Sequence, residues 1–178
     1  MSVLSWIARL LWFFLPVALA NMAPVLVKDR LAVLAKPIDA GRRIFGNHKT
    51  WRGLVVATIS AGLLFFMQWY LAGQLPLFQA ISAYDYAQFP WWFGFLFGGC
   101  AILGDLVKSF VKRRFHIAAG ASWFPFDQID FLVGALLALE LFIDVDILTW
   151  VLALSLGISL HILVNRIGFH LHFKTTPW

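Results

Sequence analysis

One predicted helix end carries a carboxylate, a hydroxyl and two cations that could act on the same ligand. Asp105, Ser109 and Lys112 stand at positions i, i+4 and i+7, so they share one face if the chain is helical there. Arg113 follows four residues after Ser109, next to that face. Asp105 also closes an uncharged run that reaches back to Tyr86, and ionisable groups at such edges tend to be functional. The pattern favours a site for a charged ligand over a purely structural role for Asp105.

Two further aspartates, Asp127 and Asp130, stand three residues apart and share a face if a helix begins near Pro125. Carboxylates this close repel each other unless a cation lies between them. Mg²⁺ is held by one or two carboxylates together with substrate phosphates and water. Three aspartates among several Lys and Arg residues would therefore suit a metal-bound triphosphate in phosphoryl or nucleotidyl transfer. The plainer alternative is that the aspartate pair caps a helix start and that the cations at 112–114 are ordinary charge beside a membrane.

A second cluster of candidate residues lies in the basic segment 41–53. Its glycines and Asn47 favour a turn, and Thr50 is placed to N-cap the helix that follows. Lys49, Thr50 and Arg52 are candidates for binding a phosphate at that helix start. A basic loop that touches anionic lipid head groups is an equally open explanation.

Membrane-spanning helices must position these residues. Hydrophobic residues make up 61% of the 178-residue chain and charged residues only 13%, whereas a soluble domain carries about a quarter charged residues. A helix needs roughly 20 apolar residues to cross the hydrocarbon core. The sequence predicts an all-α polytopic integral membrane protein that forms one domain over residues 1–178. Its five transmembrane helices are expected at about 3–27, 53–73, 89–104, 129–143 and 147–164.

The distribution of charge predicts the orientation. Apart from Arg9, every Lys and Arg lies in the segment 28–52, the segment 108–114 or the C-terminal tail. The connections 74–90 and 144–146, which would lie on the opposite side, contain none. Because positive charge gathers in cytoplasmic loops, we expect the N-terminus outside, the C-terminus in the cytoplasm, and a site on the cytoplasmic face of the cell membrane. Within the third span, Gly94 and Gly98 form a G-x-x-x-G that would let a neighbouring helix approach closely.

Several separated motifs, in order from about residue 21 to the end, closely resemble the CDP-archaeol synthase family. They are Arg43-Ile44-Phe45-Gly46 with Lys49-Thr50-Trp51-Arg52-Gly53, Gly104-Asp105 with Ser109-Phe110 and Lys112-Arg113-Arg114, Pro125 with Asp127-Gln128, Asp130-Phe131 and Gly134-Ala135, and Asn165-Arg166-Ile167 with Pro177-Trp178. The same core is more distantly similar to CDP-diacylglycerol synthase, whose signature has a Gly-Asp, a Ser-x-x-Lys-Arg and two aspartates three apart. That signature's His-Gly-Gly is replaced here by residues 123–126, and the chain is shorter, which favours the CDP-archaeol branch.

The resemblance implies a Mg²⁺-dependent cytidylyltransferase of phospholipid biosynthesis. The phosphate of a membrane lipid phosphate would attack the α-phosphorus of CTP and release pyrophosphate, and the expected lipid is 2,3-bis-geranylgeranyl-glyceryl phosphate. The residues that it implies as catalytic are Asp105, Asp127, Asp130 and Lys112, and the three aspartates are implied as Mg²⁺ ligands. Those that it implies as substrate-binding are Ser109, Arg113, Lys49, Thr50 and Arg52.

Functions from other classes are the alternatives. The same chemistry on phosphatidic acid and a non-catalytic membrane protein both stay open. A transporter is disfavoured, because its ligand groups should lie near the bilayer midplane on broken helices, whereas the charges here crowd one interface. A nucleic-acid partner is disfavoured, because the basic residues behind the net charge of +5 flank apolar segments. The oligomeric state is left open.

Overall fold

The named elements of the structure are all helices, which confirms the all-α part of the predicted fold class. The structure is a computed structural model that describes residues 2–27, 30–42, 44–46, 49–118 and 121–170. Arg43, Asn47 and the Pro177-Trp178 ending, which belong to the predicted motifs, lie outside these ranges. Within them the elements are α1 (Val3–Leu26), η1 (Ala32–Leu34), α2 (Trp51–Gln74), α3 (Pro76–Ala80), η2 (Tyr86–Gln88), α4 (Phe93–Arg114), α5 (Phe126–Glu140) and α6 (Ile147–His170).

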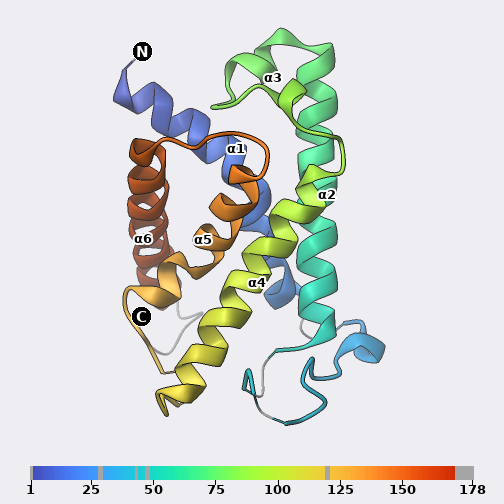
Figure 1. Cartoon of the computed structure of the whole chain (residues 1–178), viewed down its shortest axis with the longest axis vertical. Helices are drawn as coiled ribbons and strands as arrows, with labels where there is room; N and C mark the ends of the chain where they lie inside the picture. The colour runs from blue at the N-terminus through green and yellow to red at the C-terminus, as the bar shows by residue number, and fades with distance from the viewer. Residues whose placement is uncertain (1, 28–29, 43, 47–48, 119–120, 171–178) are drawn as a thin grey trace.

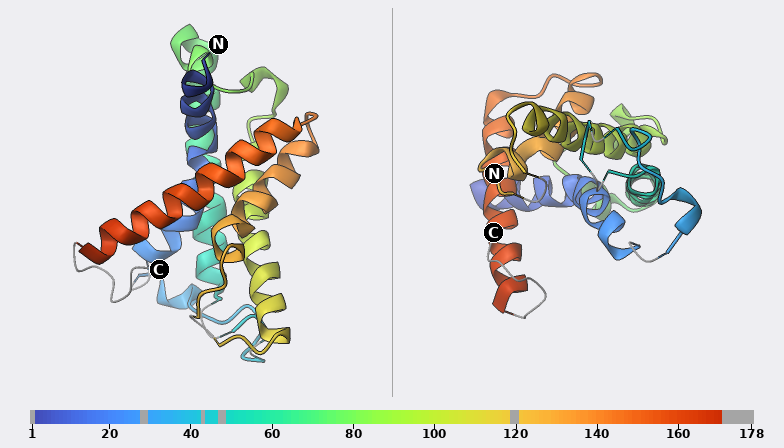
Figure 2. Two further views of the ribbon diagram at one scale, coloured as in Figure 1. Left: turned by 90° about the vertical axis from the view of Figure 1, so that its left-hand side faces the viewer. Right: turned by 90° about the horizontal axis from the view of Figure 1, so that it is seen from below.

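The long helices run alternately down and up (Figure 1). α1 descends from the N-terminus, α2 ascends, α4 descends, α5 ascends and α6 descends again. The connections from α1 to α2 and from α4 to α5 therefore meet at the lower end of the molecule. α4 packs against α1, α2 and α5, whereas α6 packs against α5 and leans away from α4 (Figure 2). α4 is thus the helix around which the others are arranged.

Four of these helices, α1, α2, α4 and α6, are long and apolar enough to cross a membrane. α4 continues as a helix to Arg114, well beyond residue 104, where the third span was expected to end. The predicted fourth span corresponds to α5, which has 15 residues. At about 1.5 Å per residue it is about 22 Å long, less than the roughly 30 Å of a hydrocarbon core. α5 is therefore not among the four candidate spans.

Small residues bring α2 and α4 together. A Cβ on Gly98 would lie 2.3 Å from the Cβ of Ala61, and a Cβ on Gly94 would lie 2.3 Å from the Cβ of Phe65. No real Cβ makes contacts this short, so both positions need glycine. Helices in a bilayer associate through such close van der Waals packing rather than through a hydrophobic driving force. The predicted role of the G-x-x-x-G in close helix approach is confirmed, with α2 of the same chain as the neighbour.

A second pair of glycines sets the distance between α4 and α5. A Cβ on Gly104 would lie 2.2 Å from the carbonyl oxygen of Asp130, and a Cβ on Gly134 would lie 2.1 Å from the carbonyl oxygen of Cys100. Here backbone meets backbone from both sides, so neither helix can yield by moving a side chain. The contact sits beside Asp105 on α4 and at Asp130 on α5. It therefore fixes how closely the aspartates of the two helices approach.

Candidate active site

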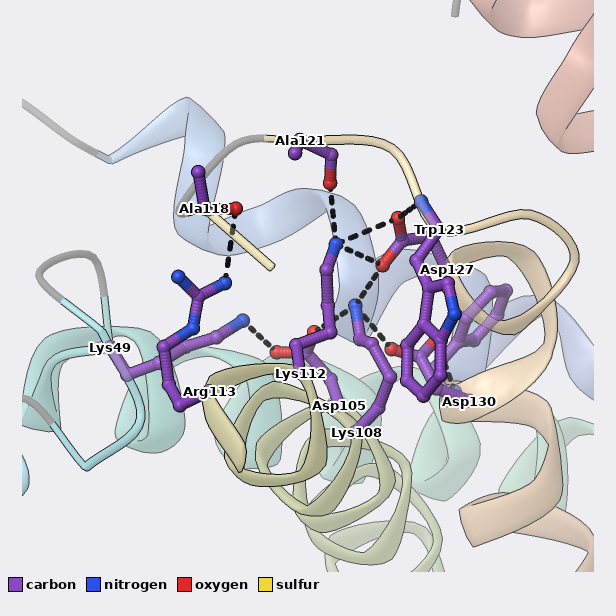
Figure 3. Close-up of polar contacts among 11 residues, drawn as sticks. Lys49, Asp105, Lys108, Lys112, Arg113, Ala118, Ala121, Trp123, Asp127 and Asp130 are labelled. Atoms are coloured by element: carbon purple, nitrogen blue, oxygen red, sulfur yellow. Dashed lines mark hydrogen bonds and ion pairs between the residues drawn. The ribbon is translucent and has the colours of Figure 1, made fainter. Parts of the chain in front are cut away.

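Three aspartates and three lysines form one cluster (Figure 3), which lies toward the lower end of α4 in the view of Figure 1. They come from three places in the fold: the last turns of α4, the first turn and a half of α5, and the segment just before α2. The members are Asp105, Lys108 and Lys112 on α4, Asp127 and Asp130 on α5, and Lys49. We call this set the Asp–Lys cluster. The structure thus brings together the three aspartates, Lys112 and Lys49, as the sequence analysis expected.

Lys108 is the centre of the Asp–Lys cluster. Its Nζ lies 3.2 Å from Asp105 Oδ1, 2.9 Å from Asp127 Oδ1 and 2.8 Å from Asp130 Oδ2. From the sequence, Lys108 was predicted only as one of the positive charges beside the membrane. The signal that would have singled it out is its spacing of three residues from Asp105, which puts both side chains on one face of α4.

The α4–α5 connection is folded back onto Lys112. α4 ends at Arg114, and His116 turns the chain two residues later with a positive φ of 56°. The N–H of Ile117 donates to the carbonyl oxygen of Lys112 at 3.0 Å. A hydrogen bond of this kind, from an N–H to the carbonyl oxygen five residues earlier, is typical of a helix C-terminus. The returning chain places the carbonyl oxygen of Ala121 2.6 Å from Lys112 Nζ. Lys112 is buried, so its charge is directed at the groups inside this loop rather than at solvent.

Asp127 is held by donors from both sides. Lys112 Nζ lies 3.0 Å from its Oδ1 and 2.9 Å from its Oδ2, and the N–H of Trp123 donates to Oδ2 at 2.6 Å. Burial alone would raise the pKa of Asp127, but the hydrogen bonds from Lys108, Lys112 and the Trp123 N–H outweigh it and hold this pKa below its ordinary value. Asp127 is therefore a carboxylate at neutral pH.

Capping does not account for the two aspartates of α5. The N-cap of α5 is Pro125, which makes no side-chain capping hydrogen bond, although Asp127 does lie in the first turn. Asp130 is buried against α4, and its Oδ1 accepts from the N–H of Phe131 at 2.7 Å. Its Oδ2 has the ion pair with Lys108 but no hydrogen bond among the described residues. A buried carboxylate oxygen in this state has lone pairs available for a cation.

Four of the predicted substrate-binding residues lie around the cluster. The Thr50 hydroxyl accepts from the N–H of Gly53 at 3.2 Å, which confirms the predicted N-cap of α2. Arg52 donates to the carbonyl oxygen of Arg30 at 2.9 Å and is not joined to the aspartates. The two on α4 differ in burial and partners: Ser109 is buried in the same turns as the cluster residues, and Arg113 donates to the carbonyl oxygen of Ala118 at 3.2 Å. The Nε of Arg113 is buried and lacks a partner in the part of the chain that the structure describes.

The oxygens of the cluster suit a hard divalent cation, but a lysine stands among them. Carboxylate oxygens are the ligands that Mg²⁺ prefers. In the described ranges no three His, Cys, Asp or Glu side chains are close enough together to hold a metal ion as they stand. The three carboxylates instead converge on the nitrogen of Lys108. The donor set therefore fits Mg²⁺ in chemistry, while the Lys108 nitrogen occupies the point on which its oxygens converge.

Known proteins resemble this chain over nearly its whole length. The family model for CDP-archaeol synthase, of the CarS-like type, matches residues 3–178. The CDP-archaeol synthase of Methanospirillum hungatei is 36% identical over 88% of this chain and all of its own length. That of Methanopyrus kandleri is 34% identical over 94% of this chain and 91% of its own, and that of Sulfurisphaera tokodaii is 30% identical over the whole of both chains.

A solved structure agrees with these relatives. It is described as an intramembrane enzyme for archaeal membrane lipid biosynthesis and superposes with a TM-score of 0.68. It is 27% identical in sequence, over 87% of this chain and 91% of that one. The resemblance noted in the motifs around Asp105, Asp127 and Lys49 is confirmed by these comparisons. The chain belongs to the CDP-archaeol synthase family, the membrane-embedded cytidylyltransferases of lipid biosynthesis that transfer the cytidylyl group of CTP to an archaeal lipid phosphate.

Proposed function

We propose that this protein uses Mg²⁺ and the Asp–Lys cluster to transfer the cytidylyl group of CTP to an archaeol-type ether lipid phosphate lying in the membrane. A phosphate oxygen of the lipid attacks the α-phosphorus of CTP, and the bond between that phosphorus and the oxygen leading to the β-phosphate breaks. The products are a CDP-lipid and pyrophosphate. No protein nucleophile is needed, because the lipid supplies the attacking oxygen. The observation that carries this proposal is an apolar groove whose lining includes two members of the charged cluster.

The groove lies between α4 and α5 and has a volume of about 600 Å³. Its lining is almost wholly apolar, with side chains such as Leu103, Val133 and Leu137, and it also includes Lys108 and Asp130 of the Asp–Lys cluster. Leu103 and Leu137 are more than half exposed, as expected for side chains that face lipid. A lipid entering from the bilayer would lay its hydrocarbon along these residues and bring its phosphate to the lysine. The lipid would react without leaving the membrane.

The Asp–Lys cluster offers carboxylates for a metal ion and positive charges for phosphate oxygens, both of which cytidylyl transfer needs. Asp105, Asp127 and Asp130 would hold Mg²⁺, which, when bound, neutralises charge on the triphosphate and orients it. Lys112 and Lys49 would bind phosphate oxygens, since each carries a point charge already at the site. Arg113, whose Nε has no partner in the described structure, and the buried Ser109 are placed to add hydrogen bonds to the nucleotide. Thr50 and Arg52 would act through the backbone at the start of α2, where phosphates bind readily.

The orientation follows from where the charge gathers. If α5 also crosses the bilayer despite its shorter length, the up-and-down order of the helices in Figure 1 would put the N-terminus and the basic connections on opposite sides. By the positive-inside rule, the cluster and the C-terminus would then lie on the cytoplasmic side of the cell membrane. CTP would reach the cluster from the cytoplasm, and the whole chain, residues 1–178, would act as one domain.

Filling the groove is expected to weaken lipid binding and spare nucleotide binding. In Val133→Trp the larger side chain would occupy the space proposed for the lipid chains, so we expect KM for the lipid phosphate to rise about tenfold with KM for CTP unchanged. Steady-state kinetics with each substrate varied in turn measures this. Leu63→Trp, at an exposed site on α2 outside the groove, is the matched control. Equal KM for the lipid in Val133→Trp and Leu63→Trp would remove the groove from the proposal.

A further inference from the structure

We infer that Lys108 is a built-in counter-cation: it holds the three aspartates together before the metal binds, and it leaves their meeting point when Mg²⁺ arrives with CTP. The inference rests on the proposed function, because it assigns a role at the same site. It concerns a residue that neither the sequence motifs nor the family resemblance singled out.

The geometry separates Lys108 from the other lysines. Its nitrogen is within 3.2 Å of an oxygen from each of the three carboxylates. Lys49 pairs only with Asp105, and Lys112 pairs only with Asp127. Lys108 is therefore the one lysine in the described cluster that occupies the point on which all three carboxylates converge.

The aspartates need a cation at that point. Their side chains are only 20%, 18% and 6% exposed for Asp105, Asp127 and Asp130, so solvent screens their mutual repulsion poorly. Asp105 lies on α4, whereas the other two lie on α5. Without a central positive charge the repulsion would act across the α4–α5 contact. Lys108 offsets it and keeps the three carboxylates facing one point.

The same position cannot hold both cations. Mg²⁺ needs its oxygen ligands at about 2.0–2.1 Å, and a nitrogen at 2.8–3.2 Å from the same oxygens fills the centre of the site. A lysine can vacate it, because its charge sits at the end of a flexible four-carbon stem. Three lysines balance three aspartates before binding, so two added positive charges are favourable only if the triphosphate comes with them. The displaced ammonium then pairs with phosphate oxygens.

This exchange predicts that metal and nucleotide bind cooperatively, each raising the affinity for the other. Mn²⁺ binding, followed by electron paramagnetic resonance with and without α,β-methylene-CTP, tests this without any turnover. In Lys108→Met the site is vacated in advance, so we expect Mn²⁺ alone to bind about tenfold more tightly than in the wild type. The enhancement by the nucleotide analogue should fall by about the same factor.

Lys112→Met is the matched control, because it removes one positive charge from the cluster and leaves the meeting point filled. We expect it to change the affinity for Mn²⁺ alone less than about threefold. Equal tightening in the two variants would mean that only the general loss of positive charge matters, and it would overturn the inference. No tightening in Lys108→Met would overturn it as well.

Thermal unfolding in EDTA gives a second readout. Lys108→Met should unfold at a lower temperature than the wild type, and saturating Mn²⁺ should raise its midpoint by more than it raises that of the wild type. If Lys108→Met does not fold, the double variant Lys108→Met/Asp130→Asn, which removes one charge of each sign, should fold; its failure would overturn the inference. Absence of CDP-lipid formation in the wild type would instead contradict the proposed function, and the results on Mn²⁺ binding would still hold.

Discussion

Asp127→Asn is expected to lower the rate of CDP-lipid formation by at least about 10³-fold while the protein stays folded. The substitution keeps the shape of the side chain and one oxygen that can accept from Trp123 or Lys112. It removes the negative charge that a divalent cation would need and on which Lys108 and Lys112 converge. Turnover of labelled CTP, measured beside circular dichroism and gel filtration in detergent, separates loss of chemistry from loss of fold.

Asp146→Asn is the control for that substitution. Asp146 lies at the other end of the molecule, where its carboxylate accepts from the N–H of Thr149 at 2.9 Å and from the Thr149 hydroxyl at 2.7 Å. An asparagine can keep such a helix-start contact, so this variant should turn over CTP at the wild-type rate. Wild-type turnover in Asp127→Asn would contradict the assignment of Asp127 as a metal ligand.

Gly134→Ala is expected to cost both stability and activity, although it adds only one methyl group. The new Cβ would lie 2.1 Å from the carbonyl oxygen of Cys100, which is backbone and moves only if α4 moves. Overpacking of this kind costs about 1–3 kcal/mol. Moving α5 away from α4 would also shift Asp127 and Asp130 away from Asp105 and Lys108. A displacement of about 1 Å in a site can lower the reaction rate about 10²-fold.

Gly73→Ala tests whether the effect belongs to the α4–α5 contact. Gly73 is also helical, but a Cβ there meets nothing within 4 Å, so alanine should leave stability unchanged or raise it slightly. Thermal unfolding midpoints in detergent and turnover rates of the two variants give the comparison. If Gly134→Ala matched Gly73→Ala in both measurements, close backbone packing would not be what positions the aspartates.

Part of the site could be predicted from local spacing along the chain. The i, i+4, i+7 pattern of Asp105, Ser109 and Lys112 follows from helix geometry alone, and so does the pairing of Asp127 with Asp130. Thr50 was recognisable as an N-cap from its residue type and position. Each of these inferences needs only neighbours within two turns of helix, where sequence distance determines spatial distance.

The rest depends on contacts between distant segments. Lys49 reaches Asp105 across 56 positions of the chain, which no periodicity encodes. Lys108 looked like ordinary charge beside a membrane until α5 brought two more carboxylates to it. Gly134 carried no signal in isolation, because the need for glycine there comes from the backbone of α4. Arg52 points to the carbonyl oxygen of Arg30 because of how the chain turns before α2, which its basic neighbours do not reveal.

The most direct test of the central claim is a turnover assay on the purified protein in liposomes with Mg²⁺ and CTP labelled at the α-phosphate. An archaeol-type ether lipid phosphate and phosphatidic acid are offered in parallel reactions. The account predicts that the label appears in a CDP-lipid formed from the ether lipid phosphate, with one pyrophosphate released for each lipid made. Product from phosphatidic acid alone would contradict the assigned lipid, and no labelled lipid from either, in protein shown to be folded, would contradict the proposed chemistry.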